Sequence, residues 1–385
     1  MKKAVMYGAG NIGRGFIGKV FSDSGYEVCF IDIDKRIIDA FNEDRQYDVK
    51  IVSDGFEMLE KVNNVYAVDG NTEEAVRKIA ECDIMATAVG VKVLPYIIDN
   101  IANAIKMRMK NGNGPLDIIL AENQLDVDAL MKEMIYKKLD MKEQEWTEKN
   151  LGLVEASIGR MVPPLTEEER KESPLLIAVE PYSELPVDSM GFKGIIPELV
   201  GLKPFAPFSF YIKRKLFLHN MGHAICAYLG WQKKYGYISD AIRDKEIYNK
   251  TKSAMELVVE ALSREYPQIP YSEIEANKDD LLQRFHNRAL KDTISRVAND
   301  PLRKLRRDDR LIGAALYCLE NGINPDEIIE GIIAALKYDN PDDATAMKIQ
   351  SHLSEFGLNY IMEHVMDLDE GSELAVLIIR RYEIR

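Results

Sequence analysis

The sequence is poor in cysteine, histidine and tryptophan, and it has no long apolar run. Its 385 residues include 4 cysteines, 5 histidines and 2 tryptophans. No window approaches the roughly 18 uninterrupted apolar residues that cross a bilayer. The opening Met1-Lys2-Lys3 leads into a glycine-rich run before a secretory apolar region could develop. These absences predict a cytoplasmic protein that has no membrane partner.

The few cysteines form no recognisable pattern. They are scattered in apolar surroundings, without CxxC pairs or a disulfide framework, at Cys29, Cys82, Cys226 and Cys318. We therefore expect buried, reduced thiols in a reducing compartment. Histidine, cysteine and carboxylate side chains are not clustered at the spacing of zinc ligands, so no metal site is predicted.

The chain also lacks an excess of positive charge. Its 50 Lys and Arg residues stand against 63 Asp and Glu residues, for a formal net charge of −13. This charge disfavours nucleic acid and anionic membranes as partners. With 46% hydrophobic residues the composition is that of a globular protein, and the length allows two or three domains.

The order of apolar runs divides the chain into two parts. In the first, strand-like runs alternate with helical patterns, which predicts an α/β domain with a Rossmann-type doubly wound sheet. From about Pro207 onward helical periodicity dominates. We predict a nucleotide-binding domain at residues 1–200 and a mostly α-helical substrate and catalytic domain at residues 201–385. The strand-like runs lie near residues 4–7, 27–31, 50–52, 65–68, 83–89, 116–121 and 175–179.

A glycine-rich loop follows the first predicted strand. Gly8-Ala9-Gly10-Asn11-Ile12-Gly13 is a GxGxxG motif that opens a helix, the context in which this motif binds a dinucleotide pyrophosphate. Asp32 ends the second strand, where its carboxylate can bind the adenosine ribose and would repel a 2′-phosphate. NAD is therefore the predicted cofactor, although Lys35 and Arg36 leave NADP open. The small residues Thr87-Ala88-Val89 end a later strand and are predicted to lie against the cofactor.

The glycine loop has two other interpretations. A methyltransferase also combines a glycine-rich first loop with an acidic second strand, but its loop usually has the pattern GxGxG. A glycine turn beside a solvated aspartate would need no ligand at all. The succession of strand, turn, helix and acidic strand end favours the dinucleotide site over both.

A polar constellation lies on a predicted helix over residues 211–229. At about 100° per residue, Lys215, Asn220 and His223 fall on one side of it. A lysine whose pKa is lowered by burial can take the proton of an alcohol. An amide can donate to the developing alkoxide, and a histidine can orient the hydroxyl. The alternative is an ordinary amphipathic helix with a solvated polar face.

A second amide candidate is Asn123, which follows the predicted strand at residues 116–121. The carboxyl ends of strands are where such sheets bind ligands. An asparagine in front of a helix is, however, more often only an N-cap.

Three separated motifs resemble the polyol-specific long-chain dehydrogenases. They are the glycine run at residues 8–18, the spacing Lys215-x4-Asn220-x2-His223, and Pro301-Leu302-Arg303-Lys304-Leu305. The resemblance runs through most of the chain and includes Glu122-Asn123 and residues 160–164. One departure is Gly159, because the family more often has an acidic residue directly before Arg160. This difference could alter the preference among polyols.

The resemblance implies a role for each candidate residue. Lys215 would be the general acid/base, and Asn123 and Asn220 would form a pair that stabilises the oxyanion. Arg296 and Lys304 would contact the polyol. The family resemblance also implies a metal-independent reaction and a monomer, without excluding a dimer.

A basic segment near Lys304 offers a place for an anionic substrate. Residues 303–310 carry five basic and two acidic side chains, a net charge of +3, and guanidinium groups suit phosphate oxygens. The alternative is a solvated face partly neutralised by Asp308 and Asp309. With the resemblance, Arg303 and Lys304 are expected to face the substrate, while Arg306 and Arg307 stay unassigned.

The expected reaction is reversible hydride transfer between C5 of mannitol 1-phosphate and NAD, which yields fructose 6-phosphate. Alternatives within the superfamily are a dehydrogenase of an unphosphorylated polyol, such as mannitol or arabinitol, and a hexuronate reductase. A non-catalytic NAD-binding sensor is a minor alternative. The expected partner is thus a small sugar phosphate or polyol.

Overall fold

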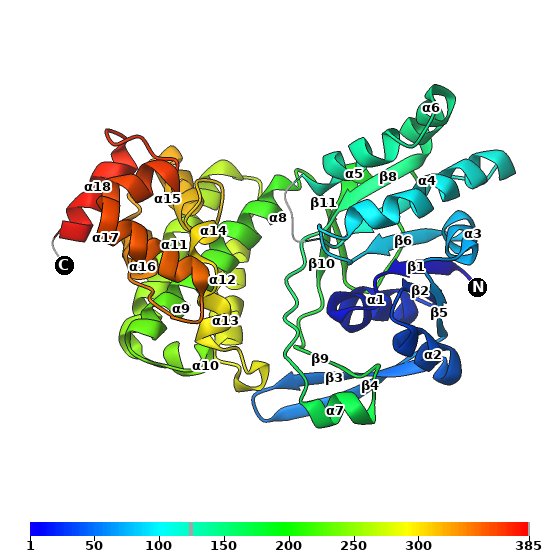
Figure 1. The fold of residues 1–385 in the computed structure, drawn as a ribbon, viewed down its shortest axis with the longest axis horizontal. Helices are drawn as coiled ribbons and strands as arrows, with labels where there is room; N and C mark the ends of the chain where they lie inside the picture. Colours follow the sequence, from blue (N-terminus) through cyan, green and yellow to red (C-terminus); the bar gives the residue numbers. More distant parts are fainter. Residues whose placement is uncertain (123–125, 384–385) are drawn as a thin grey trace. The chain divides into compact units, whose positions relative to one another are not determined.

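The computed structural model describes residues 1–122 and 126–383. The chain divides into two compact units, Met1–Ser209 and Phe210–Arg385 (Figure 1). Among the described residues, no helix combines the length and the apolar character needed to cross a membrane.

A six-stranded parallel sheet forms the centre of the first unit. Its order is β5-β2-β1-β6-β7-β8. The order of the strands reverses between β1 and β6, and doubly wound sheets bind ligands at such a reversal. The predicted Rossmann-type sheet is confirmed. The strands are β1 (Lys3–Tyr7), β2 (Glu27–Asp32), β5 (Val65–Asp69), β6 (Ile84–Thr87), β7 (Leu116–Leu120) and β8 (Leu151–Glu155).

Apolar side chains are buried on both faces of this sheet. Successive residues of β1 alternate between two cores, since Ala4 and Met6 belong to one and Val5 and Tyr7 to the other. Strands buried on both faces appear in the sequence as continuous apolar runs, which is why most of them could be predicted. The helices of this unit are η1 (Gly13–Ile17), α1 (Gly18–Asp23), α2 (Lys35–Asp44), α3 (Glu73–Glu81), α4 (Leu94–Asn111), α5 (Val127–Tyr136), α6 (Met141–Asn150), α7 (Glu167–Glu172) and η2 (Ser189–Gly191).

A smaller sheet differs from the expectation. β3 (Gln46–Ser53), whose centre was expected in the main sheet, instead pairs antiparallel with β4 (Phe56–Asn63) and parallel with β9 (Ile177–Val179). The two-residue turn Asp54-Gly55, with φ of 73° at Gly55, closes the β3–β4 hairpin. A further short pair consists of β10 (Leu185–Asp188) and β11 (Leu202–Phe205).

The second unit is helical, as predicted. In its described part, residues 210–383, the only β pairing is an isolated bridge between Tyr237 and Thr293. The central helix α9 is almost wholly buried, and it packs on α11, α13 and α16. The approach to α16 is close, because a Cβ atom at Gly331 would lie 2.4 Å from Ile225.

The elements of this unit, which α8 joins to the first, are α8 (Ser209–Lys213), η3 (Arg214–Asn220), α9 (Met221–Gln232), α10 (Ile238–Ala241), α11 (Lys245–Glu265), α12 (Tyr271–Phe285), η4 (Arg288–Leu290), α13 (Ile294–Ala298), α14 (Pro301–Lys304), α15 (Ile312–Glu320), α16 (Asp326–Leu336), α17 (Ala344–His364) and α18 (Glu373–Glu383).

Candidate active site

The glycine loop of the first unit has room for a phosphate group. Gly8 has a φ of 97°, which glycine adopts without strain. A Cβ atom at Gly13 would lie 2.0 Å from the carbonyl oxygen of Gly8, whereas no atom lies within 4 Å of one at Gly10. The third glycine is therefore required by packing, and the second leaves open space beside the backbone. The N–H groups of the helix that begins here favour phosphate oxygens.

Asp32 lies directly beside this loop. Its Oδ2 accepts a hydrogen bond from the backbone N–H of Ala9 at 2.7 Å. Its Oδ1 accepts from the N–H groups of Ile33 at 2.7 Å and Asp34 at 3.0 Å. The carboxylate is only partly buried, so accessible oxygen lone pairs remain for ribose hydroxyls. This arrangement fits a dinucleotide, because the carboxylate of Asp32 can accept hydrogen bonds from ribose hydroxyls and the backbone N–H groups of the loop can donate to phosphate oxygens.

The loop after β6 lies against the glycine loop. A Cβ atom at Gly8 would be 2.8 Å from the carbonyl oxygen of Ala88 and 3.0 Å from a methyl carbon of Val89. Thr87, in contrast, is fully buried at the end of the strand. Of the predicted run Thr87-Ala88-Val89, the last two residues thus contact the loop.

Lys215 and Asn220 lie in a loosely wound part of the predicted helix. The helical segment runs continuously from Ser209 to Gln232, and η3 (Arg214–Asn220) is a π-helical stretch within it. Such stretches are rare in proteins, and those that occur often lie at functional sites. Burial, together with the positive charge of Arg310, lowers the pKa of the Lys215 ammonium to about 8. A lysine of this kind can exchange a proton near neutral pH.

His223 lies on α9 and contacts Asp292, which is not among the predicted site residues. Its Nε2 is 2.9 Å from Oδ2 of Asp292, and its ring stacks on Phe285 with a centroid distance of 4.8 Å. Asp292 also accepts a hydrogen bond from Nε of Arg296 at 2.9 Å. Burial raises the pKa of the Asp292 carboxyl, but the interactions with His223 and Arg296 outweigh it and leave the pKa lowered. The structure therefore brings two predicted site residues together through one buried carboxylate.

The basic segment is less exposed than its charge suggested. Lys304 is 3% exposed and donates a hydrogen bond to the carbonyl oxygen of Asn299. Burial, together with the positive charges of Arg310 and Arg303, lowers the pKa of Lys304 to about 7. The Arg303 side chain is more accessible and lies near Asp300, with 3.4 Å between Nε and Oδ2.

The positive charge of Arg310 contributes to the lowered pKa of both Lys215 and Lys304. Its guanidinium is largely buried and donates from Nε to Oδ1 of Asp309 at 2.7 Å. Arg310 belongs to the basic segment, but the sequence does not indicate its role, because a run of charges does not reveal which of its members is buried.

Two further features that the sequence analysis named are Asn123 and Gly159. Asn123 lies outside the described residues. At Gly159, a Cβ atom would be 3.1 Å from the ring of Tyr182. At this position an aromatic ring is thus packed against the backbone.

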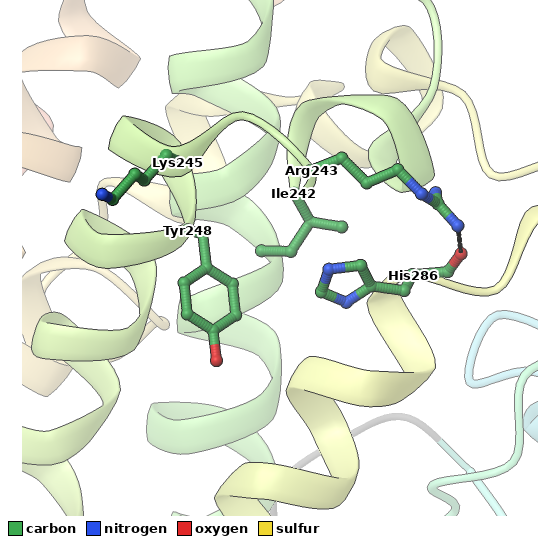
Figure 2. A pocket seen from close by; sticks show the side chains of 5 residues that line it. All are labelled: Ile242, Arg243, Lys245, Tyr248 and His286. Atoms are coloured by element: carbon green, nitrogen blue, oxygen red, sulfur yellow. Dashed lines mark hydrogen bonds between the residues drawn. The ribbon is translucent and has the colours of Figure 1, made fainter.

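The second unit also has an open pocket that none of the predicted site residues lines. The pocket has a volume of about 420 Å³ and is lined by Ile242, Arg243, Lys245, Tyr248 and His286. Figure 2 shows these five side chains. Arg243 donates a hydrogen bond to the carbonyl oxygen of His286 at 2.8 Å.

No group of three or more His, Cys, Asp or Glu side chains that could hold a metal ion occurs within residues 1–122 and 126–383.

Comparison with known families decides the classification. The model described as the mannitol dehydrogenase Rossmann domain matches residues 2–201, and the one described as the mannitol dehydrogenase C-terminal domain matches residues 208–374. The chain belongs to the mannitol dehydrogenase family. As a member of this family it is an oxidoreductase that acts on a CH–OH group, and its cofactor is NAD.

Individual relatives agree with this membership of the mannitol dehydrogenase family. The chain is 36% identical over 379 residues to a protein of Brevibacillus brevis named mannitol-1-phosphate 5-dehydrogenase, covering 97% of this chain and 96% of that protein. The fold is similar to that of a substrate-free D-sorbitol dehydrogenase, with a TM-score of 0.84, 16% identity, and coverage of 100% of this chain and 93% of that one. It is also similar to a mannitol 2-dehydrogenase of Pseudomonas fluorescens in a ternary complex with NAD and D-mannitol, with a TM-score of 0.72, 14% identity, and coverage of 99% and 91%.

Proposed function

We propose that this protein catalyses the reversible oxidation of D-mannitol 1-phosphate at C5 by NAD, which yields D-fructose 6-phosphate, NADH and a proton. The proposal is supported by the full-length similarity to a mannitol-1-phosphate 5-dehydrogenase. The structural observation that carries the mechanism is the lowered pKa of Lys215, about 8. A neutral amine is a base for a hydroxyl proton, and an ammonium can return that proton.

In the proposed mechanism, residues 1–200 bind the cofactor. NAD supplies the hydride acceptor when it is bound. The backbone of residues 8–13 binds its pyrophosphate, and Asp32 binds the hydroxyls of its adenosine ribose. Ala88 and Val89 lie against the glycine loop and limit the space beside it.

Residues 201–385 carry the groups that act on the substrate. In the oxidation, Lys215 takes the proton of the C5 hydroxyl, and in the reduction it gives the proton back. Asn220 donates a hydrogen bond to the oxygen as it becomes alkoxide-like. Asn123, the second amide that the family resemblance assigns to this role, lies outside the described residues. His223 orients the same hydroxyl, and its own orientation is set by Phe285 and Asp292.

The basic groups of this unit recognise the polar ends of the substrate. Arg296 and Lys304 contact the polyol, and Arg303 and Lys304 face the part of the substrate that carries the phosphate. Arg303 is suited to this role because its guanidinium is accessible and its only close carboxylate among the described residues is Asp300. A phosphate dianion close to Lys304 would favour the charged ammonium, which burial alone disfavours.

A substrate panel tests the proposal. Mannitol 1-phosphate, mannitol, arabinitol and a hexuronate should be assayed in parallel with NAD and NADP. We expect the highest kcat/KM with mannitol 1-phosphate and NAD. Preference for a free polyol would refute the phosphate role of the basic groups, and NADH binding without turnover on every substrate would indicate a sensor.

The quaternary state and compartment belong to the same proposal. We propose a monomer in the cytoplasm, where the buried free thiols at Cys29, Cys82, Cys226 and Cys318 would stay reduced. Light scattering coupled to size-exclusion chromatography should give the mass of one chain, about 44 kDa. A mass of twice this value would contradict the monomer.

A further inference from the structure

A buried carboxylate at the end of β7 holds the loop that follows β6. Glu122 is only 5% exposed. Its Oε1 accepts a hydrogen bond from the N–H of Val89 at 3.0 Å, and its Oε2 accepts one from the N–H of Gly90 at 2.8 Å. Both oxygens of the side chain are thus directed at two successive backbone donors of one loop.

These two hydrogen bonds fix a part of the chain that no strand pairing holds. The ladder of the main sheet ends just before it, where the N–H of Ala88 donates to the carbonyl oxygen of Tyr7 at 3.0 Å. Beyond that point the backbone turns away, and Gly90 has a φ of 87°. The carboxylate of Glu122 therefore takes the place of a strand partner for Val89 and Gly90.

The same loop packs on the glycine loop. A side chain at Gly8 would meet the carbonyl oxygen of Ala88 at 2.8 Å and the Val89 side chain at 3.0 Å. Residues 88 and 89 thus occupy the space in which any side chain at position 8 would lie, and they form one wall beside the glycine loop. Because the glycine loop must keep its backbone open for a pyrophosphate, the position of residues 88–90 affects how well the cofactor fits.

We propose that Glu122 is a positioning residue that sets the affinity for the nicotinamide cofactor by fixing residues 88–90 against the glycine loop. Glu122 does not touch the reacting atoms in this role. The inference deepens the proposed function and rests on it for the identity of the cofactor.

The opposite end of the same strand supplies a matched control. Asp117, near the start of β7, is 6% exposed. Its Oδ1 accepts from the N–H of Lys193 at 2.7 Å, and its Oδ2 accepts from the N–H of Gly194 at 3.1 Å. Asp117 thus makes the same kind of contact as Glu122, to two successive backbone donors, but away from the glycine loop.

The test compares Glu122→Gln with Asp117→Asn. Each substitution keeps the size of the side chain and replaces one accepting oxygen by an NH₂ group, so each leaves one backbone N–H without its acceptor. The dissociation constant of NADH is measured by its fluorescence in the absence of substrate, alongside the thermal midpoint Tm. We expect Glu122→Gln to raise this constant about tenfold, equivalent to about 1.4 kcal/mol. Asp117→Asn should lower Tm comparably but change the constant by less than about twofold.

Two results would overturn the proposal. One is an NADH dissociation constant of Glu122→Gln within twofold of the wild type. The other is an equal rise in both variants, which would indicate general destabilisation. The measurement uses no polyol, so a wild-type protein that binds NADH tightly but does not turn over mannitol 1-phosphate would contradict the proposed substrate and leave the role of Glu122 standing.

A measurement on the unmodified protein covers the case in which Glu122→Gln does not fold. Hydrogen–deuterium exchange of peptides containing Val89 and Gly90 reports whether their N–H groups are held before the cofactor binds. We expect both amides to exchange slowly in the free protein. Exchange at the rate of an exposed loop would refute the positioning role.

Discussion

Asp292 Oδ2 lies 2.9 Å from His223 Nε2 in the helical unit. The other oxygen of the same carboxylate accepts a hydrogen bond from Arg296. One buried acidic side chain therefore fixes both an imidazole and a guanidinium to which we assign substrate contacts. Because the carboxylate is only 7% exposed, its charge depends on these two partners.

Replacement of Asp292 should separate its structural and electrostatic effects. Asp292→Ala removes the partner of the largely buried His223 and of the more exposed Arg296. We expect a loss of about 2–3 kcal/mol in the free energy of unfolding. Asp292→Asn keeps the volume, so it should cost about 1–2 kcal/mol while raising KM for the polyol more than it lowers kcat. Denaturant titrations and steady-state kinetics measure these effects. An unchanged KM in Asp292→Asn would show that His223 and Arg296 do not need the carboxylate to bind substrate.

Lys215→Ala should lower turnover by orders of magnitude, because the proposed acid/base group is removed. Binding of NADH, measured by fluorescence, should be retained, since the cofactor is assigned to the first unit. The control is Lys213→Ala on the same helical segment, which breaks a partly exposed ion pair with Glu265 of at most about 1 kcal/mol. Near-normal turnover of Lys215→Ala would contradict the mechanism.

The two directions of the reaction should respond oppositely to pH. Oxidation needs Lys215 as a neutral amine, so kcat should rise as the pH passes the pKa of about 8. Reduction needs the ammonium form, and its kcat should fall over the same interval. Initial rates from pH 6 to 10 in both directions provide the measurement. Parallel profiles in the two directions would exclude a single group that alternates between acid and base.

Arg310 should control the position of that pH profile. Its positive charge lowers the pKa of Lys215, so Arg310→Gln should move the midpoint of kcat to higher pH. Arg306→Gln removes the same charge from the same segment, but its side chain is exposed and lies 3.6 Å from Asp308, so it should leave the midpoint unchanged. Equal shifts in both variants would point to the overall charge of the segment instead of a specific contact.

Asp32→Asn should weaken the discrimination between the two nicotinamide dinucleotides. The amide can still accept the N–H of Ala9, which the carboxylate binds at 2.7 Å, but it no longer repels a 2′-phosphate. We expect the ratio of kcat/KM for NAD to that for NADP to fall at least tenfold, largely through a lower KM for NADP. A constant ratio would mean that other groups, such as Lys35 or Arg36, set the preference.

Those parts of the fold and of the site that depend on local residue patterns could be predicted from the sequence. The parallel strands are buried on both faces and therefore show as apolar runs, and the glycine loop is contiguous. The contact of Asp32 with Ala9 could be expected, because the carboxyl ends of neighbouring parallel strands meet at one edge of the sheet. The hairpin of β3 and β4 was missed although Asp54-Gly55 is a strong turn signal.

Burial of charged side chains could not be predicted in the same way. A run of basic residues looks like a solvated surface, yet Lys304 is 3% exposed and Arg310 is largely buried. Glu122 and Asp292 are ordinary acidic residues in the sequence, and their importance comes from what surrounds them. The spacing of four between Asp292 and Arg296, typical of helical ion pairs, was the one available signal for Asp292.

The pairing of β3 with β9 has a consequence for the synthesis of the chain. Val49 is in register with Ile177, so the two strands are separated by more than a hundred residues. During translation the β3–β4 hairpin leaves the ribosome long before its third strand exists. Contacts of such sequence separation slow folding, and an unpaired strand edge exposes the nascent chain to association with other chains. We therefore expect the glycine-loop unit to complete its fold only after β9 has been synthesised.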